Sequence, residues 1–93
     1  MAQRNVQFTV TGKAGVQAFW IAVGKDDVRL VNGKGSISLD DTTSHLLTFW
    51  FEGNSGAKLS IVGKVGTTAV VEVKESAIPK GEHEAAGRKR FSL

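Results

Sequence analysis

Short runs of β-forming residues recur about every ten residues along the chain, and this spacing limits the fold more than any other feature. Val, Ile, Thr, Phe and Trp fill the runs, and glycine or Asn-Gly interrupts them. No segment has the apolar period of an amphipathic helix. The pattern therefore predicts an all-β antiparallel sandwich of roughly seven or eight short strands, with a small barrel of the oligonucleotide-binding type as the alternative.

The strands are expected at 5–11, 17–23, 28–31, 34–39, 45–52, 57–62, 67–74 and 88–93, and residues 79–87 are expected to form a polar loop. Asn32-Gly33 separates two of these runs and predicts a type I′ hairpin, because that turn requires positive φ at both positions. The order and spacing of the strands over the whole chain resemble an immunoglobulin-like or transthyretin-like domain, which implies a β-sandwich.

The composition is that of a folded globular domain. With 93 residues, 41% of them hydrophobic and 23% charged, we expect one domain spanning residues 1–93. The lack of cysteine excludes disulfides and cysteine-based zinc sites. The start of the chain lacks the apolar run of a signal peptide, and no stretch is long and apolar enough to span a membrane. We therefore predict no membrane partner, and the compartment stays open.

Catalytic patterns are missing from the sequence. No nucleophile and base pair, and no pair of carboxylates, stands at a recognisable spacing. The two histidines, His45 and His83, have no third ligand at metal spacing. We therefore expect a protein that is not an enzyme.

Two strands, 17–23 and 45–52, are apolar on both faces, although a half-buried strand should alternate apolar with polar side chains. The bulkier parity is assigned to the core: Phe19, Ile21, Val23, Leu47, Phe49 and Phe51. The other parity is assigned to the outer face: Ala18, Trp20, Ala22, Leu46, Thr48 and Trp50. A register slip of one residue would reverse the assignment, with Trp20 inside and Phe19 outside.

In an immunoglobulin-like order the two strands are neighbours, so both tryptophans would share one exposed apolar patch. The chain itself, through residues 76–87 or through Phe91 and Leu93, is one candidate cover. Another protein or a like subunit is the second, and a carbohydrate stacked on the indoles is the third. We predict a non-enzymatic module for protein interaction or assembly, with carbohydrate or small-ligand binding as the alternative.

A second candidate site follows from the expected hairpin. If pairing continues beyond Asn32-Gly33, Val28 opposes Ile37 and the open end of the hairpin collects four carboxylates. These are Asp26, Asp27, Asp40 and Asp41. Clustered oxygen ligands on loops are typical of Ca²⁺ sites, so calcium is the one cofactor that the sequence suggests. The alternative is that aspartate favours turns and that Lys25 neutralises the group.

The third candidate site is the basic run Arg88, Lys89 and Arg90 followed by Phe91. Cations beside an aromatic ring are typical of single-stranded nucleic-acid binding, because phosphates meet the charges and a base stacks on the ring. The formal net charge is only +3 and the other basic residues are scattered, which disfavours this partner.

Overall fold

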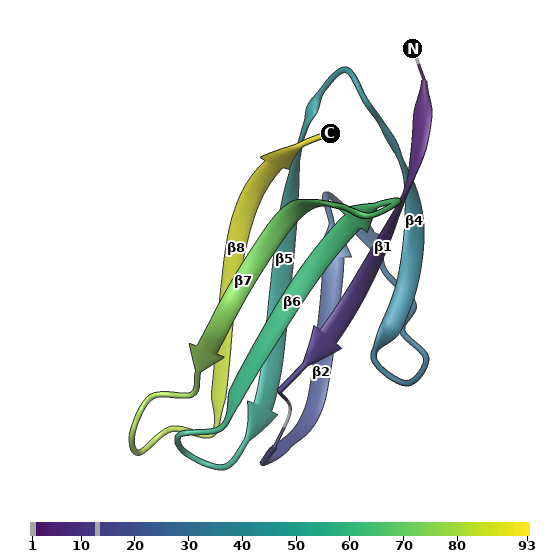
Figure 1. Ribbon diagram of the computed structural model, residues 1–93. Coiled ribbons are helices and arrows are strands. Elements are labelled where there is room, and N and C mark those ends of the chain that lie inside the picture. The colour runs from purple at the N-terminus through teal and green to yellow at the C-terminus, as the bar shows by residue number, and fades with distance from the viewer. Residues whose placement is uncertain (1, 13) are drawn as a thin grey trace.

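The computed structural model describes residues 2–12 and 14–93, and these residues form an all-β sandwich. The strands are β1 (Gln3–Thr11), β2 (Val16–Val23), β3 (Asp26–Asp27), β4 (Lys34–Asp40), β5 (Ser44–Gly53), β6 (Lys58–Val65), β7 (Thr68–Ala77) and β8 (Glu84–Ser92). Two antiparallel four-stranded sheets, β4-β1-β6-β7 and β3-β2-β5-β8, face one another (Figure 1). The predicted sandwich is confirmed, and the barrel alternative is wrong because the strands form two separate sheets.

The turn at Asn32-Gly33 forms as predicted. Asn32 has a φ of 55° and Gly33 a φ of 77°, so both residues adopt the positive φ of a type I′ turn. The backbone groups of Val31 and Lys34 exchange hydrogen bonds of 2.8 and 3.1 Å across it. The local sequence signal was therefore sufficient to place this turn.

The rest of the expected hairpin is wrong, because its two arms belong to different sheets. The amide of Val28 donates to the carbonyl of Ile21 on β2 at 3.0 Å. Ile37 of β4 instead lies opposite Val6 of β1. The segment between β3 and β4 therefore crosses from one sheet to the other.

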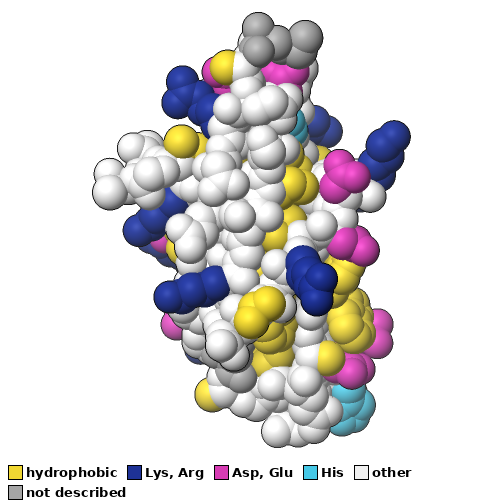
Figure 2. All heavy atoms as spheres, turned by 90° about the vertical axis from the view of Figure 1, so that its right-hand side faces the viewer, with side chains coloured by type: hydrophobic (Ala, Val, Ile, Leu, Met, Phe, Trp, Pro, Cys, Tyr) yellow, Lys and Arg dark blue, Asp and Glu magenta, His cyan; other side chains and the backbone are white. Residues whose placement is uncertain are grey.

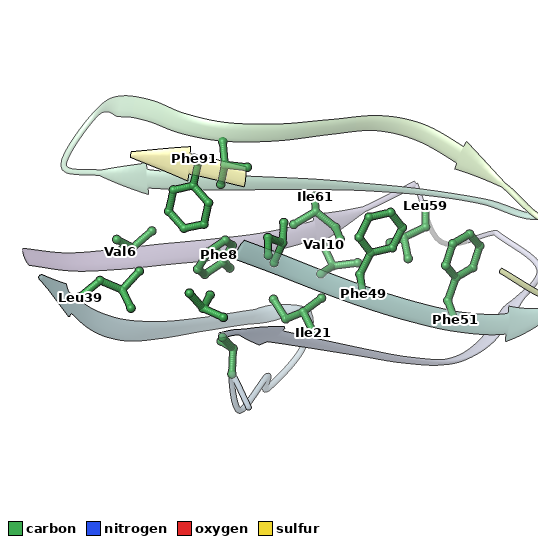
Figure 3. Packing of buried hydrophobic residues seen from close by; sticks show 14 of the residues in the cluster. Val6, Phe8, Val10, Ile21, Leu39, Phe49, Phe51, Leu59, Ile61 and Phe91 are labelled. Carbon is green, nitrogen blue, oxygen red and sulfur yellow. The ribbon is translucent and has the colours of Figure 1, made fainter. Parts of the chain in front are cut away.

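The hydrophobic core lies between the two sheets (Figure 3). Phe8 on β1 lies at its centre with no exposed surface, opposite Gly35 on β4 and Gly63 on β6. Gly63 leaves space for its ring, whereas a Cβ atom at Gly35 would clash with the backbone of Arg29. The Phe8 ring also meets Phe91 of β8 edge to face, with ring centroids 6.4 Å apart. This contact joins the central strand of one sheet to the edge strand of the other.

Strand β8 begins earlier than expected. Residues 84–87 were predicted to be loop, but they pair with Phe49 to Glu52 of β5. Gly87 lies opposite Phe49, and a Cβ atom at this glycine would lie 2.6 Å from Cζ of that ring. The small residues of this stretch have low β-propensity, so only the neighbouring strand explains why they are extended.

Candidate functional site

The two tryptophans lie side by side on the outer face of the β3-β2-β5-β8 sheet. Strands β2 and β5 pair antiparallel, with Trp20 opposite Trp50 and Ala22 opposite Thr48. On the other side of β5, Ala86 of β8 lies opposite Trp50. The expected adjacency of the two apolar strands is therefore confirmed.

The burial of the two strands confirms which parity is core. The inner parity is buried at Ile21, Val23, Leu47, Phe49 and Phe51, and Phe19 packs against the core while partly buried. Trp20, on the other parity, has 40% of its surface exposed. The reversed register, with Trp20 inside, is wrong.

We call the outer surface formed by Ala18, Trp20, Leu46, Thr48, Trp50 and Ala86 the tryptophan face. The indole Nε1 of Trp20 donates a hydrogen bond of 3.0 Å to Oδ1 of Asp27. This bond satisfies the polar end of the indole and holds the ring in place. Ala22 has the same parity as Trp20 on β2 but is only 3% exposed, so the structure corrects its assignment as an interaction residue.

The segments expected to cover the tryptophan face do not fold across it, and residues 84–87 instead extend the same sheet as part of β8. Phe91 is buried in the core, and Leu93 packs against the same core cluster. The loop between β7 and β8 is bound to the β5–β6 turn, where the Ser55 hydroxyl accepts from the amide of Gly81 at 2.9 Å and donates to the carbonyl of Pro79 at 3.2 Å. Among the described residues, these segments therefore leave Trp20 exposed, whereas Trp50 is half-buried.

Charged side chains lie at both ends of the tryptophan face. Glu52 of β5 is paired with Glu84 of β8 at one end. At the other end Thr48 is paired with Arg88, and Arg90 follows two residues later. In the part of the chain that the structure describes, the ion pairs are Arg4 with Asp41 and Lys74 with Glu72, so the charges on this face have no ion-pair partner. The sequence prediction missed Glu84 and Ala86, because their place depends on the early start of β8. Glu52 lay in the predicted strand 45–52, on the parity of Trp50, but was not assigned to the site.

The four carboxylates proposed as a calcium site do not converge. Asp26 and Asp27 form β3 in one sheet, whereas Asp40 ends β4 in the other. Asp41 accepts from Nε of Arg4 at 3.3 Å. Among residues 2–12 and 14–93, no group of three or more histidine or acidic side chains is arranged to hold a metal ion. The prediction failed because it extended the Asn32-Gly33 hairpin across two sheets.

Asp40 closes the turn that leads into β5. Its Oδ1 accepts from the amide of Thr42 at 2.7 Å and from the Thr42 hydroxyl at 2.6 Å. The hydroxyl bond, together with the amide bond, lowers the pKa of Asp40 below its ordinary value of 3.8. His45 adds a smaller effect in the same direction. This carboxylate therefore has a structural role in the turn.

The predicted nucleic-acid surface is not continuous. Arg88 and Arg90 share the parity of Ala86 and lie on the tryptophan face, whereas Lys89 lines an open hollow beside β7. Phe91 is 6% exposed, so the structure corrects the idea that its ring could stack on a base. β8 is an edge strand, and charged residues on such a strand oppose pairing with another edge.

The surface near the tryptophan face has little depth. An open hollow of about 300 Å³ lies at its edge, lined by Thr48, Ala86, Gly87 and Arg88.

Figure 2 looks onto the side of the sandwich where β4 lies and shows hydrophobic side chains along the seam between the two sheets. No helix in the described residues could span a membrane.

Comparison with protein-family models, with curated proteins and with solved structures gave no match to this chain.

Proposed function

We propose that this chain is a non-enzymatic module for protein interaction or assembly, and that its tryptophan face is the binding surface. One observation carries the proposal: Trp20 and Trp50 are paired in register on an outer sheet face, where Trp20 is 40% exposed and Trp50 is half-buried. Buried aromatic anchors contribute much of the binding energy at protein interfaces, and tryptophan is enriched among them.

The distribution of aromatic residues supports this reading. Four phenylalanines are buried and the fifth packs against the core, whereas Trp20 remains 40% exposed. A domain of this size gains much of its stability from each large apolar side chain that it buries. Leaving 40% of Trp20 in solvent gives up part of that gain, and a contact with another molecule would recover it.

The low relief of the surface favours a protein partner over a small ligand. Ala18 and Ala86 flank the indoles with short side chains, so a broad surface can approach them closely. Pockets for small molecules are instead concave and enclose most of the ligand. The finer fold type, immunoglobulin-like or transthyretin-like, stays a prediction.

Carbohydrate binding is the second candidate, and the hollow of about 300 Å³ lined by Thr48, Ala86, Gly87 and Arg88 is the observation that favours it. A sugar ring stacked on the indole would be within reach of the polar side chains of Thr48 and Arg88. The calcium-assisted form of this proposal has lost its support, because the four aspartates are separated.

Photo-crosslinking in the source cells tests the proposed function. The photoreactive residue p-benzoylphenylalanine is placed at position 86, on the tryptophan face, and in a matched control at position 36, on the exposed outer side of β4. We expect protein adducts at position 86 and none at position 36. Equal labelling at both positions, or no protein adduct at position 86, would refute the proposal. Loss of glycan binding in a Trp50→Ala variant would support the carbohydrate alternative instead.

A further inference from the structure

The tryptophan face is complementary to itself, because opposite charges lie on either side of its central row. That row consists of Trp20, Trp50 and Ala86. The next row toward one end contains Thr48 and Arg88, and the next row toward the other end contains Glu52 and Glu84. The central row therefore has a cation on one side and carboxylates on the other.

We propose that the partner of the tryptophan face is a second copy of this chain, related by a two-fold axis that runs across the strands along the central row. This inference rests on the proposed function of the face. The axis places opposite ends of the two faces against each other, so that Glu84 of one copy meets Arg88 of the other. Glu52 meets Thr48 in the same way, and the two tryptophan rows meet each other.

The two-fold symmetry doubles the number of favourable charge contacts in this arrangement. A two-fold interface contains every contact twice, so the contact between Glu84 and Arg88 occurs at both ends of the dimer. Neither residue has an ion-pair partner within its own described chain. Association thus supplies each of them with an opposite charge while the indoles leave water.

A face-to-face dimer with its axis along the strands is less favourable. That axis would place Asp27 of one copy near Arg88 of the other, but Asp27 already accepts the hydrogen bond of the Trp20 indole. It would also leave both glutamates of each face without a cation. The dimer with its axis across the strands gives Glu84 and Arg88 of each copy an opposite charge, and it leaves the hydrogen bond between Trp20 and Asp27 intact.

Pairing of two β8 edges is also disfavoured. An antiparallel pair centred on the basic run would set Arg88, Lys89 and Arg90 against the same three residues of the second copy. Like charges directly opposite each other destabilise a strand pair. The same residue, Arg88, thus opposes edge pairing and favours the face-to-face contact.

The contact area predicts a weak dimer. With a strand spacing of about 4.8 Å and a rise of about 3.3 Å, three strands over about eight residues cover roughly 400 Å². Specific complexes bury about 800 Å² on each partner, so we expect a dissociation constant of roughly 10 μM or higher. Added salt should weaken the dimer further by screening the charges.

Sedimentation velocity of the purified full chain, from about 1 μM to about 1 mM, tests the proposal. We expect a concentration-dependent dimer that dissociates more readily at high salt. Arg88→Glu and Glu84→Arg should each raise the dissociation constant by about tenfold or more, because each creates two repulsive contacts. The double variant, in which the charges are exchanged, should return to within about threefold of the wild-type value.

Lys64→Glu is the matched control. Lys64 lies exposed on β6 in the other sheet, and its reversal changes the net charge by the same amount as Arg88→Glu. We expect it to leave the dissociation constant unchanged. Thermal unfolding of every variant checks that the fold is retained.

Three results would overturn the inference: a monomer throughout the concentration range, a dimer that the charge reversals do not weaken, or a double variant that is not rescued. A monomer combined with adducts to a different protein at position 86 would leave the proposed function standing. The absence of protein adducts at position 86 would remove the proposed function as well.

Discussion

Gly63 offers the sharpest test of how the core is packed, because two side chains occupy the space that its missing Cβ would need. It faces the core from β6, opposite Phe8 on β1 and Val71 on β7. A Cβ atom at this position would lie 2.7 Å from Cε1 of Phe8 and 2.8 Å from Cγ1 of Val71. Both distances are well inside van der Waals contact, and the Phe8 side chain is fully buried.

Two opposing effects decide the result of Gly63→Ala. Replacing glycine by alanine reduces the entropy of the unfolded chain and by itself stabilises a protein by about 0.4–1 kcal/mol. Overpacking a core by one methyl group costs about 1–3 kcal/mol. Since Phe8 and Val71 close the site from both sides, we expect the second effect to dominate and the free energy of unfolding to fall by about 1–2 kcal/mol.

Urea denaturation followed by tryptophan fluorescence measures this change, and the midpoint of thermal unfolding should fall by about 4–8 °C for each kcal/mol lost. The control is a double-mutant cycle with Val71→Ala, which removes one of the two obstructing side chains. We expect a favourable coupling of at least about 1 kcal/mol between the substitutions. A stabilised Gly63→Ala variant, or additive effects in the cycle, would refute the steric reasoning.

Phe91→Ala should lower the free energy of unfolding by about 3–5 kcal/mol in urea denaturation, because the ring is buried; a loss below about 1 kcal/mol would contradict its place in the core. Thr42→Val should raise the pKa of Asp40 in an NMR titration, because the hydroxyl bond to the carboxylate is lost. Since that pKa is lowered in the folded state, its stabilising contribution is present above the unfolded value of 3.8 and is lost as the pH falls below it. Asp27→Ala should increase iodide quenching of tryptophan fluorescence, because Trp20 loses the bond that holds its indole; unchanged quenching would contradict this.

The strands and the identity of the core faces were predictable because their signals are local. The bulkier of the two parities assigned Ile21 and Phe49 to the core, and the two residues Asn32 and Gly33 carried the whole signal of the turn. A strand seen by itself already shows which of its parities is richer in bulky apolar groups. The adjacency of Trp20 and Trp50 followed from that assignment together with the pairing of β2 and β5.

The errors arose where the outcome depends on distant residues. Ile37 pairs with Val6 on β1, and no signal near the Asn32-Gly33 turn shows that the chain changes sheets there. The start of β8 was missed because its small residues favour a strand only beside Phe49. That error also hid Glu84 on the tryptophan face, and with it the charge arrangement on which the proposed dimer depends.

The late position of β8 in the chain affects how the protein is made. β5 ends at Gly53, whereas its neighbour β8 begins only at Glu84. During synthesis on the ribosome, β5 therefore emerges well before the strand that covers its second edge, and it is apolar on both faces in the meantime. We expect nascent chains halted before β8 to aggregate or to require a chaperone, because an apolar strand with an open edge is prone to pair with other chains.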